Sequence, residues 1–441
     1  MDSMHRARDH QSMSTVTETP TGTVPATSAA PASASDRVVA PRGRRVHTRR
    51  RHGFGFWVVA FAFLTVMAFA TVPAPLYVVY QARDGFPTFT TTVIFAAYGV
   101  GVVGSLYLAG HLSDVHGRRP LILVSIALEL VAAVLFLLWN DVTGLIVARL
   151  VTGLGVGTLT ATATAHLGEL RVRATGSSDS AKGASVAAGA VNLGGLSLGA
   201  LVGGALAEFV GQPLMVPYVV FVIALAVAFV LVLAAPETVD RPEQPVAYRP
   251  QRMQAPEGQG AAFWAAGAAA FAALAVQGLF TSVAPSFLGT TFHVTDRLAA
   301  GATTFGVFAA SALSQIVFAR LSQRAQIRLG MVLLVVGLVV LAVAAVLLQV
   351  GGFIGGGVVA GAGVGLLFRA AIGSAAALVG PERRGGVLAA TFLIAYAGLT
   401  VPVVAVGAAL LVIPTLPVLI GYVVLVAVLA VVAGTRLAAR A

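Results

Sequence analysis

Twelve apolar runs, each long enough to cross a lipid bilayer, follow one another along most of the chain. A helix needs roughly 20 residues to cross about 30 Å of hydrocarbon. In lipid, a single apolar run satisfies its own backbone hydrogen bonds only as a helix. With 58% hydrophobic and 10% charged residues, the chain is predicted to be an all-α membrane protein. The predicted spans are residues 56–80, 91–110, 120–139, 143–167, 185–207, 214–235, 261–288, 300–319, 329–350, 353–379, 386–411 and 413–434.

Two polar stretches set the predicted organisation of the chain. The first, at the N-terminus, is rich in Ser, Thr, Ala and Pro and ends in a basic cluster, a composition typical of disorder. The second separates the sixth and seventh spans. The predicted order is a disordered basic cytoplasmic tail at 1–52, an N-terminal six-helix bundle at 53–236, a cytoplasmic linker at 237–260, a C-terminal six-helix bundle at 261–435 and a cytoplasmic tail at 436–441.

The first apolar run, Phe54–Tyr80, could also be read as part of a cleaved signal peptide. It is longer than a typical signal-peptide core and lacks a clear small-residue cleavage site. We therefore expect it to be retained as the first membrane helix.

Basic residues lie almost entirely in alternate loops, which predicts the orientation of the chain through the positive-inside rule. With the basic N-terminal tail in the cytoplasm, the opposite side carries only Arg83 and Arg297. The sequence therefore predicts a multi-pass protein of a cell membrane (plasma or inner membrane) with both termini in the cytoplasm. The basic residues expected on the cytoplasmic side are Arg118, Arg119, Arg171, Arg173, Lys182, Arg241, Arg249, Arg252, Arg320, Arg324, Arg328, Arg383, Arg384, Arg436 and Arg440.

Several function classes are excluded by composition and motif context. The formal charge of +11 is scattered over short loops, so nucleic-acid binding is not expected. Glycine patterns at 99–104 and 195–199 resemble nucleotide-binding and hydrolase motifs, but both lie inside predicted spans. No cysteine is present, and the eight histidines show no ligand spacing. We therefore expect no enzyme activity, no cofactor and no metal site.

The two halves of the chain repeat one another. GLGVG at 153–157 returns as GAGVG at 361–365, each time in the fourth span of a six-helix half. LVGGAL at 201–206 has a counterpart in AVGAAL at 405–410. Two related bundles facing each other across a membrane can rock and expose a central site to alternate sides.

The segment GHLSDVHGRRP at 110–120 resembles the loop signature between the second and third helices of major facilitator superfamily (MFS) transporters. The resemblance covers residues 54–435 and implies two pseudo-symmetric six-helix bundles and secondary transport by alternating access. It also implies that this loop is a latch between the bundles that stabilises one access state. A solvated loop that only sets orientation is the alternative. The matching residues are Gly110, Leu112, Asp114, Gly117, Arg118 and Arg119.

Two further segments resemble signatures of the same family. Arg149 and Gly153 match a fourth-helix pattern in which Thr152 replaces the usual Gln. The fifth helix is similar to the pattern of antiporters, which favours proton-coupled efflux; Ala200 replaces the proline of that pattern and leaves proton-symport uptake open. The fifth-helix glycines that match are Gly195, Gly199, Gly203 and Gly204.

Three charged residues lie inside predicted spans, where each costs about 2.5–3.5 kcal/mol to insert. Glu129, Arg149 and Arg369 are therefore site candidates. One hypothesis is that Glu129 is the proton-binding carboxylate and that it takes a proton when Arg149 moves away in one access state. A permanent ion pair between the two residues is the alternative. Arg369 either faces the cavity or extends to the cytoplasmic surface.

The absence of an acidic residue in the first span and the unpaired Arg369 predict a cavity with excess positive charge. We expect a small neutral or anionic amphipathic substrate, with protons as the coupling ion and the bilayer as surroundings, and a monomeric protein. A transport-inactive sensor or scaffold on the same fold is the remaining alternative. The polar residues expected to line the cavity are Tyr77, Asn192, Gln277, Gln315 and Tyr396.

Overall fold

The computed structural model describes residues 42–109, 112–178, 180–239, 255–256 and 258–440. Within these ranges the chain forms helices and no strand, and twelve segments are long and apolar enough to cross a membrane. The predicted fold class and the number of spans are thereby confirmed. Gly110, most of the predicted tail and most of the predicted linker lie outside the described residues.

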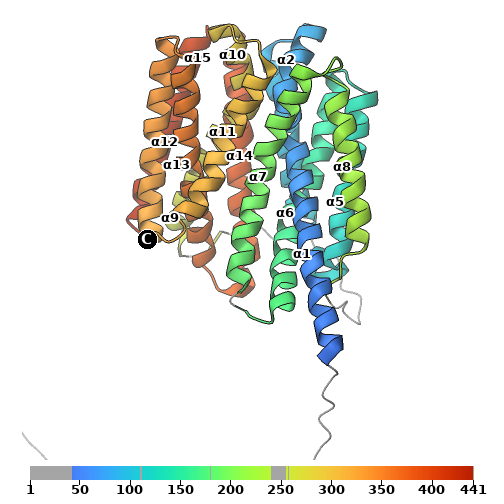
Figure 1. Ribbon diagram of the computed structural model, residues 1–441. Helices are drawn as coiled ribbons and strands as arrows, with labels where there is room; N and C mark the ends of the chain where they lie inside the picture. The colour runs from blue at the N-terminus through green and yellow to red at the C-terminus, as the bar shows by residue number, and fades with distance from the viewer. Residues whose placement is uncertain (1–41, 110–111, 179, 240–254, 257, 441) are drawn as a thin grey trace, which may run out of the picture. The chain divides into compact units, whose positions relative to one another are not determined.

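The helices of the structure are labelled in Figure 1. They are α1 (Arg42–Thr71), α2 (Pro73–Asp84), α3 (Thr88–Ala109), α4 (Leu112–His116), α5 (Arg118–Leu138), α6 (Val142–Thr175), α7 (Ser180–Phe209), α8 (Val216–Leu233), α9 (Gly260–Ser282), α10 (Ala284–Phe292), α11 (Arg297–Val317), α12 (Gln323–Val346), α13 (Val350–Ala377), α14 (Pro381–Ala409) and α15 (Thr415–Ala438).

The bundle has two ends that differ in charge. We call the end at which α5 begins at Arg118 and α12 begins at Gln323 the basic end; it lies at the bottom of Figure 1. The end at which α2 finishes at Asp84 and α10 finishes at Phe292 is the opposite end. Because successive spans are antiparallel, each loop can be assigned to one of these two ends.

The first and the seventh spans are each interrupted near the opposite end, whereas the sequence predicted single helices over 56–80 and 261–288. The first breaks between α1 and α2 at Val72, and the other breaks between α9 and α10 at Val283. Pro73 and Pro285 lie in the first turn after these breaks. Proline has no backbone N–H and cannot continue a helical ladder, but it begins a new helix well.

Three other helix ends differ from the predictions. The structure places the first turns of α1 at Arg42, inside the tail predicted to be disordered. At its basic end α6 continues to Thr175, eight residues beyond the predicted 167, and Gly176 ends it with a left-handed φ of 77°. Polar residues are tolerated in this extension because a helix that projects beyond the hydrocarbon is no longer limited by hydropathy. Similarly, α14 begins at Pro381, in a segment predicted to be a loop.

The repeated glycine motifs occupy equivalent contacts in the two halves. A Cβ atom on Gly153 or Gly157 of α6 would collide with the backbone or a side chain of α3. In the second half, Gly361 and Gly365 of α13 meet the backbone of α11 in the same way. The repeat therefore encodes close helix contacts, as small residues commonly do between membrane helices.

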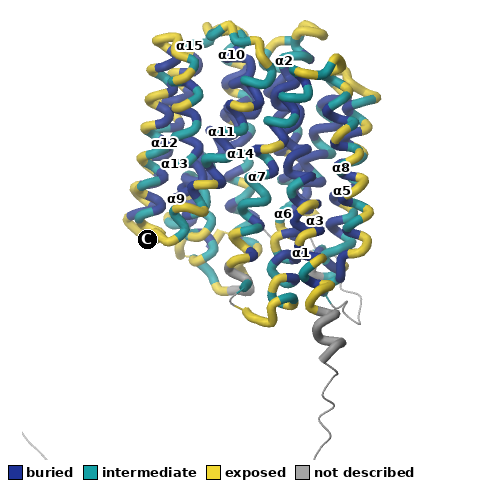
Figure 2. Tube along the Cα trace, viewed as in Figure 1, coloured by how far each residue is buried: buried dark blue, intermediate teal, exposed yellow. Residues whose placement is uncertain are grey.

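Apolar residues cover the outer surface of the bundle as well as its interior. Figure 2 shows the buried residues concentrated where helices face one another and the exposed residues on the outer helix faces. Many of those exposed residues are large and apolar, including Val124 and Leu138 of α5 and Val336 of α12. Such a surface is expected of helices that face lipid, because lipid tails are as apolar as the protein core.

Candidate functional site

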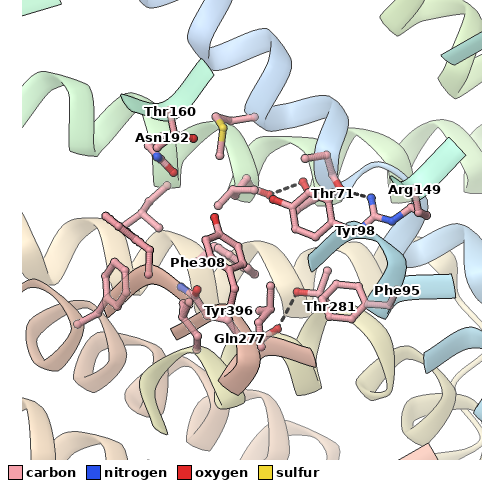
Figure 3. Close-up of a pocket in the computed structure, with 18 residues that line it drawn as sticks. Thr71, Phe95, Tyr98, Arg149, Thr160, Asn192, Gln277, Thr281, Phe308 and Tyr396 are labelled. Atoms are coloured by element: carbon pink, nitrogen blue, oxygen red, sulfur yellow. Dashed lines mark hydrogen bonds between the residues drawn. The ribbon is translucent and has the colours of Figure 1, made fainter. Parts of the chain in front are cut away.

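A central cavity lies between the two halves and is drawn in Figure 3. Its wall is mostly apolar and aromatic, with a few polar groups contributed by both halves. Such a mixture of apolar area and few polar groups is typical of small-molecule sites. The lining residues are Met67, Ala70, Thr71, Phe95, Tyr98, Arg149, Thr160, Asn192, Leu193, Leu196, Leu274, Gln277, Thr281, Phe308, Phe368, Phe392, Tyr396 and Leu399.

Arg149 is the one charged residue in the wall of the central cavity, and its side chain is only 1% exposed. Its Nη1 donates a 2.7 Å hydrogen bond to the backbone carbonyl oxygen of Ala70 in α1. Its guanidinium carbon lies 4.5 Å from the ring centre of Tyr98, a cation–π distance. The Nε atom has no hydrogen-bond partner. The side chain is thus held in place while one of its buried donors remains unpaired.

Glu129 of α5 is fully buried behind this wall and does not line the cavity. Among the described residues, neither carboxyl oxygen has a hydrogen-bond partner, and no ion pair within 4.0 Å joins Glu129 to Arg149. The carboxyl group packs against Gly155 of α6, where a Cβ atom would collide with Oε1. The structure therefore brings the two charges into the same half without pairing them.

A second cavity, which we call the basic-end cavity, adjoins the first, and Thr160, Asn192, Leu193, Phe368 and Phe392 line both. It reaches Ser185 near the start of α7 and Ile372 near the end of α13, both at the basic end. Arg369 also lines it and donates a hydrogen bond from Nη1 to the backbone carbonyl of Gln315. Neither set of lining residues contains Asp or Glu, so the described walls carry two cations and no anion.

Four of the five polar residues expected in a cavity line one. Asn192, Gln277 and Tyr396 line the central cavity, and Gln315 lines the basic-end cavity. Tyr77 lines neither: its side chain is 1% exposed and its hydroxyl has no hydrogen-bond partner.

The cavities are closed at the opposite end by contacts between the halves. Gly204 of α7 and Gly301 of α11 cross so closely that a Cβ on Gly204 would lie 3.1 Å from the Gly301 Cα. The hydroxyl of Ser286 in α10 donates a 3.0 Å hydrogen bond to the Gln81 side chain in α2. Near the same end, a Cβ on Gly407 of α14 would collide with Thr92 of α3. This arrangement is a state of the bundle closed at the opposite end and hollow toward the basic end.

The loop with the family signature is anchored by an acidic residue that sequence reasoning missed. Glu237, after α8, accepts hydrogen bonds at 3.0 Å from the backbone N–H groups of Arg118 and Arg119. It also accepts from the N–H groups of Thr238 and Val239. Partial burial raises the pKa of Glu237, but these four hydrogen bonds to the charged form outweigh burial, so the pKa falls below its usual value.

Gly117 makes this capping geometry possible. Its φ of 98° is one that residues with a side chain rarely adopt, and a Cβ would lie 2.7 Å from Glu237. Leu112 and Asp114 lie on the short helix α4, and the Asp114 side chain lies outside the described part of the structure. The anion caps the first turn of α5, where unpaired N–H groups and the helix dipole favour negative charge.

Further polar residues extend this network within the N-terminal half. Arg118 forms an ion pair of 3.3 Å with Glu169 of α6 and donates a hydrogen bond to Ser113. The Thr238 hydroxyl donates to Glu169 and lies 3.1 Å from Nδ1 of the buried His166. The sequence contains one signal for this network, Glu169 in the segment GELRVR. Because α6 is continuous through this segment, Glu169 lies beside the loop that carries the family signature.

The fifth-helix glycines pack α7 against two different neighbours. Cβ atoms on Gly195 and Gly199 would collide with the backbone of α1 at Leu64 and Ala68, and a Cβ on Gly203 would collide with the backbone of Val72 at the break after α1. Gly204 instead faces α11 of the other half. The pattern therefore holds α7 between the first helix and the seam between the halves.

The family model of the Major Facilitator Superfamily matches residues 57–401. No curated protein matches the sequence significantly. Among solved structures, a crystal structure of a POT family transporter in complex with 5-aminolevulinic acid is similar, with a TM-score of 0.68 and 12% identity over 87% of this chain and 95% of that chain. The twelve spans, the repeated halves and the match over most of the sequence agree: the chain belongs to the Major Facilitator Superfamily and is a secondary transporter of that family.

Proposed function

We propose that this transporter exports a small neutral or anionic amphipathic molecule in exchange for protons, by alternating access through the central cavity. The observation that carries this proposal is the composition of the two cavity walls: aromatic and apolar surface, Arg149 and Arg369, and no carboxylate among the lining residues. An apolar wall binds the body of an amphipathic molecule, and an arginine binds an acidic group with charge-assisted hydrogen bonds. A lipophilic cation would find no counter-charge there.

We further propose that the basic end faces the cytoplasm of a cell membrane and that both termini lie on that side. The basic residues at the starts of α5 and α12 support this orientation through the positive-inside rule. The described state would then be inward-open, ready to receive a molecule for export.

In this proposal Glu129 is the proton-binding group. A fully buried carboxylate without a hydrogen-bond partner or ion pair is costly when ionised, so Glu129 holds a proton while Arg149 is bound to Ala70. When substrate binds from the basic end, Arg149 leaves Ala70 and approaches Glu129, which stabilises the carboxylate and releases the proton on the side from which substrate is taken, as exchange requires. The fifth-helix glycines, similar to those of antiporters, support exchange rather than co-transport.

Proton-symport uptake is the second candidate, and the place of Arg149 favours it for an anionic substrate. An anion bound at Arg149 offsets the positive charge nearest Glu129, and this makes protonation of Glu129 easier. Anion and proton would then bind together, as symport requires. A neutral substrate makes no such electrostatic contribution.

Binding of a ligand at constant pH distinguishes the two directions of coupling. A thermal-stability screen of the purified protein with small carboxylates and neutral amphiphiles first identifies a ligand, because a molecule that binds the folded state raises its stability. The proton balance is then measured in weakly buffered solution. Proton release on binding supports exchange, and proton uptake supports symport. No proton change in the wild type, or the same change in the wild type and E129Q, would contradict proton coupling through Glu129.

A further inference from the structure

The helices α7 and α11 touch at the opposite end and line a cavity toward the basic end. On α7, Gly204 and Ala200 contact Gly301 of α11, and the Ser197 hydroxyl donates a 3.0 Å hydrogen bond to the Phe305 carbonyl. Continuing along the same face of α7 with helical spacing, the next residues are Leu193, Ala190 and Val186. These three line the basic-end cavity. One face of α7 therefore changes from helix contact to cavity wall.

The facing stripe of α11 changes in the same way. Below Gly301 and Phe305, Ala312 and Ile316 line the basic-end cavity. Figure 1 shows α7 and α11 next to one another at the front of the bundle, with α14 behind them. The two helices thus form a wedge whose narrow part is the glycine crossing and whose wide part is hollow.

The rim of this wedge is apolar and lies at the basic-end limits of two candidate spans. Val186 is 41% exposed and Ile316 is 44% exposed, and both also belong to the cavity wall. Val186 lies within the span Gly183–Phe209, and Ile316 lies within the span Arg297–Val317, each close to its basic end. The adjoining Leu313 and Val317 of α11 are exposed as well, on the outer surface of the span.

Polar groups begin immediately inside the rim. Arg369 of α13 donates to the backbone carbonyl of Gln315, the neighbour of Ile316, so its guanidinium lies against the inner side of α11. Asn192 and Thr160 follow toward the central cavity. An amphipathic molecule entering from the side would meet apolar residues with its tail and an arginine with its head.

We propose that this wedge is a lateral portal, through which an amphipathic anion enters the cavity from the adjoining lipid leaflet, with its acidic group at Arg369 and its apolar tail between α7 and α11. The inference rests on the proposed function for the transport of such a molecule. It adds the route of entry and the requirement for an apolar tail. A molecule that partitions into the leaflet reaches the site without crossing an aqueous mouth.

The first test measures whether acyl chains reach the wedge. The chain contains no cysteine, so A190C or A312C can be labelled singly with bimane in phosphatidylcholine vesicles that carry a nitroxide on the acyl chain. V336C on the lipid-facing side of α12 is the exposed control, and L274C in the central cavity is the interior control. We expect the nitroxide to quench A190C and A312C as strongly as V336C. Quenching as weak as that of L274C would overturn the portal.

The second test measures what the portal selects, using octanoate and dodecanoate as probes in lipid nanodiscs. We expect dodecanoate to raise the melting temperature more than octanoate in the wild type. A190W should remove this difference by filling the wedge, and the milder A190L, which guards against misfolding, should reduce it. R369Q should reduce the stabilisation by both carboxylates, whereas R328Q, a substitution of an exposed arginine at the same end, should not.

The outcomes separate the portal from the proposed function. Equal stabilisation by both carboxylates, with A190C unquenched, would overturn the portal and leave anion transport standing. Stabilisation by neither carboxylate would contradict the anion preference on which both proposals depend.

Discussion

Arg149 donates a 2.7 Å hydrogen bond to the backbone carbonyl of Ala70, immediately before the break between α1 and α2. The last carbonyl groups of a helix lack helical partners, and Pro73 supplies no N–H to continue the ladder. The arginine therefore joins α6 to the end of α1 and at the same time presents its charge to the central cavity. Movement of α1 relative to α6 would break this bond and release Arg149.

Replacement of Arg149 by lysine conserves the positive charge, but we still expect it to weaken anion binding. Lysine keeps the charge but cannot bond Ala70, lie over Tyr98 and offer a further donor at once. Loss of one charge-assisted hydrogen bond corresponds to about 1.5–3 kcal/mol, or roughly a tenfold to hundredfold rise in Kd. Calorimetry with the best carboxylate of the screen measures this. Unchanged affinity in R149K would place the anion elsewhere.

Replacement of Glu129 by glutamine should remove the pH dependence of transport while leaving ligand binding in place. Glutamine has nearly the same shape but cannot exchange a proton. Flux in vesicles at several pH values checks this, with D84N at the surface of the opposite end as the control. A pH profile of E129Q that matches the wild type would exclude Glu129 as the coupling group.

Gly155 should be required for the position of the Glu129 side chain. A Cβ at residue 155 would collide with Oε1, so G155A must push the carboxyl group away from α6. We expect G155A to weaken the pH dependence of flux, which E129Q should remove. G168A, in the same helix but with no atoms near its Cβ position, is the matched control. Equal pH profiles for G155A and G168A would count against this role.

The loop cap formed by Glu237 should stabilise the fold in a pH-dependent way. Because the pKa of Glu237 is lowered in the folded state, its contribution is present above the unfolded pKa, about 4.3, and is lost as pH falls through the folded value. At neutral pH, E237Q should lower the stability by about 1–3 kcal/mol. Melting curves should show this difference shrinking below about pH 4.3. A difference that does not depend on pH would mean that the charge is irrelevant.

The twelve spans were predictable because membrane hydrocarbon imposes a length on every apolar helix. The breaks at Val72 and Val283 were not, since a proline in an apolar run marks either a kink or a new helix. The contact of Arg149 with Ala70 was also beyond sequence reasoning, because its acceptor is a backbone group 79 positions away. A permanent ion pair with Glu129 was one of the two alternatives, and the structure leaves that carboxyl group without a partner.

The cavity residues were partly predictable for a similar reason. Polar residues in apolar spans, such as Asn192 and Gln277, stand out in a sequence, but Phe308 and Phe392 do not differ from ordinary core residues. Tyr77 resembled a cavity residue and is buried away from both cavities. Glu237 lies after a span in a polar stretch, where nothing in the sequence distinguishes a capping carboxylate from a solvated one.

Substitution of Gly301 should favour the opposite access state. G301L places a large side chain where Ala200 and Gly204 now approach, so α7 and α11 cannot close at the opposite end. Maleimide labelling of S286C, whose native hydroxyl bonds Gln81 across the halves, should become faster in the G301L background. G421L on α15, where no atoms lie near the Cβ position, should leave the rate unchanged. Slow labelling in both variants would argue against the glycine crossing as a gate.

The most direct measurement of alternating access is a pair of distances in one membrane-reconstituted protein. Spin labels at S185C and I372C report the width of the basic-end cavity, and labels at Q81C and S286C, in a second variant, report the opposite end. When ligand or pH is changed, the account predicts that the first distance shortens as the second lengthens. Two distances that stay constant, or that lengthen together, would contradict it.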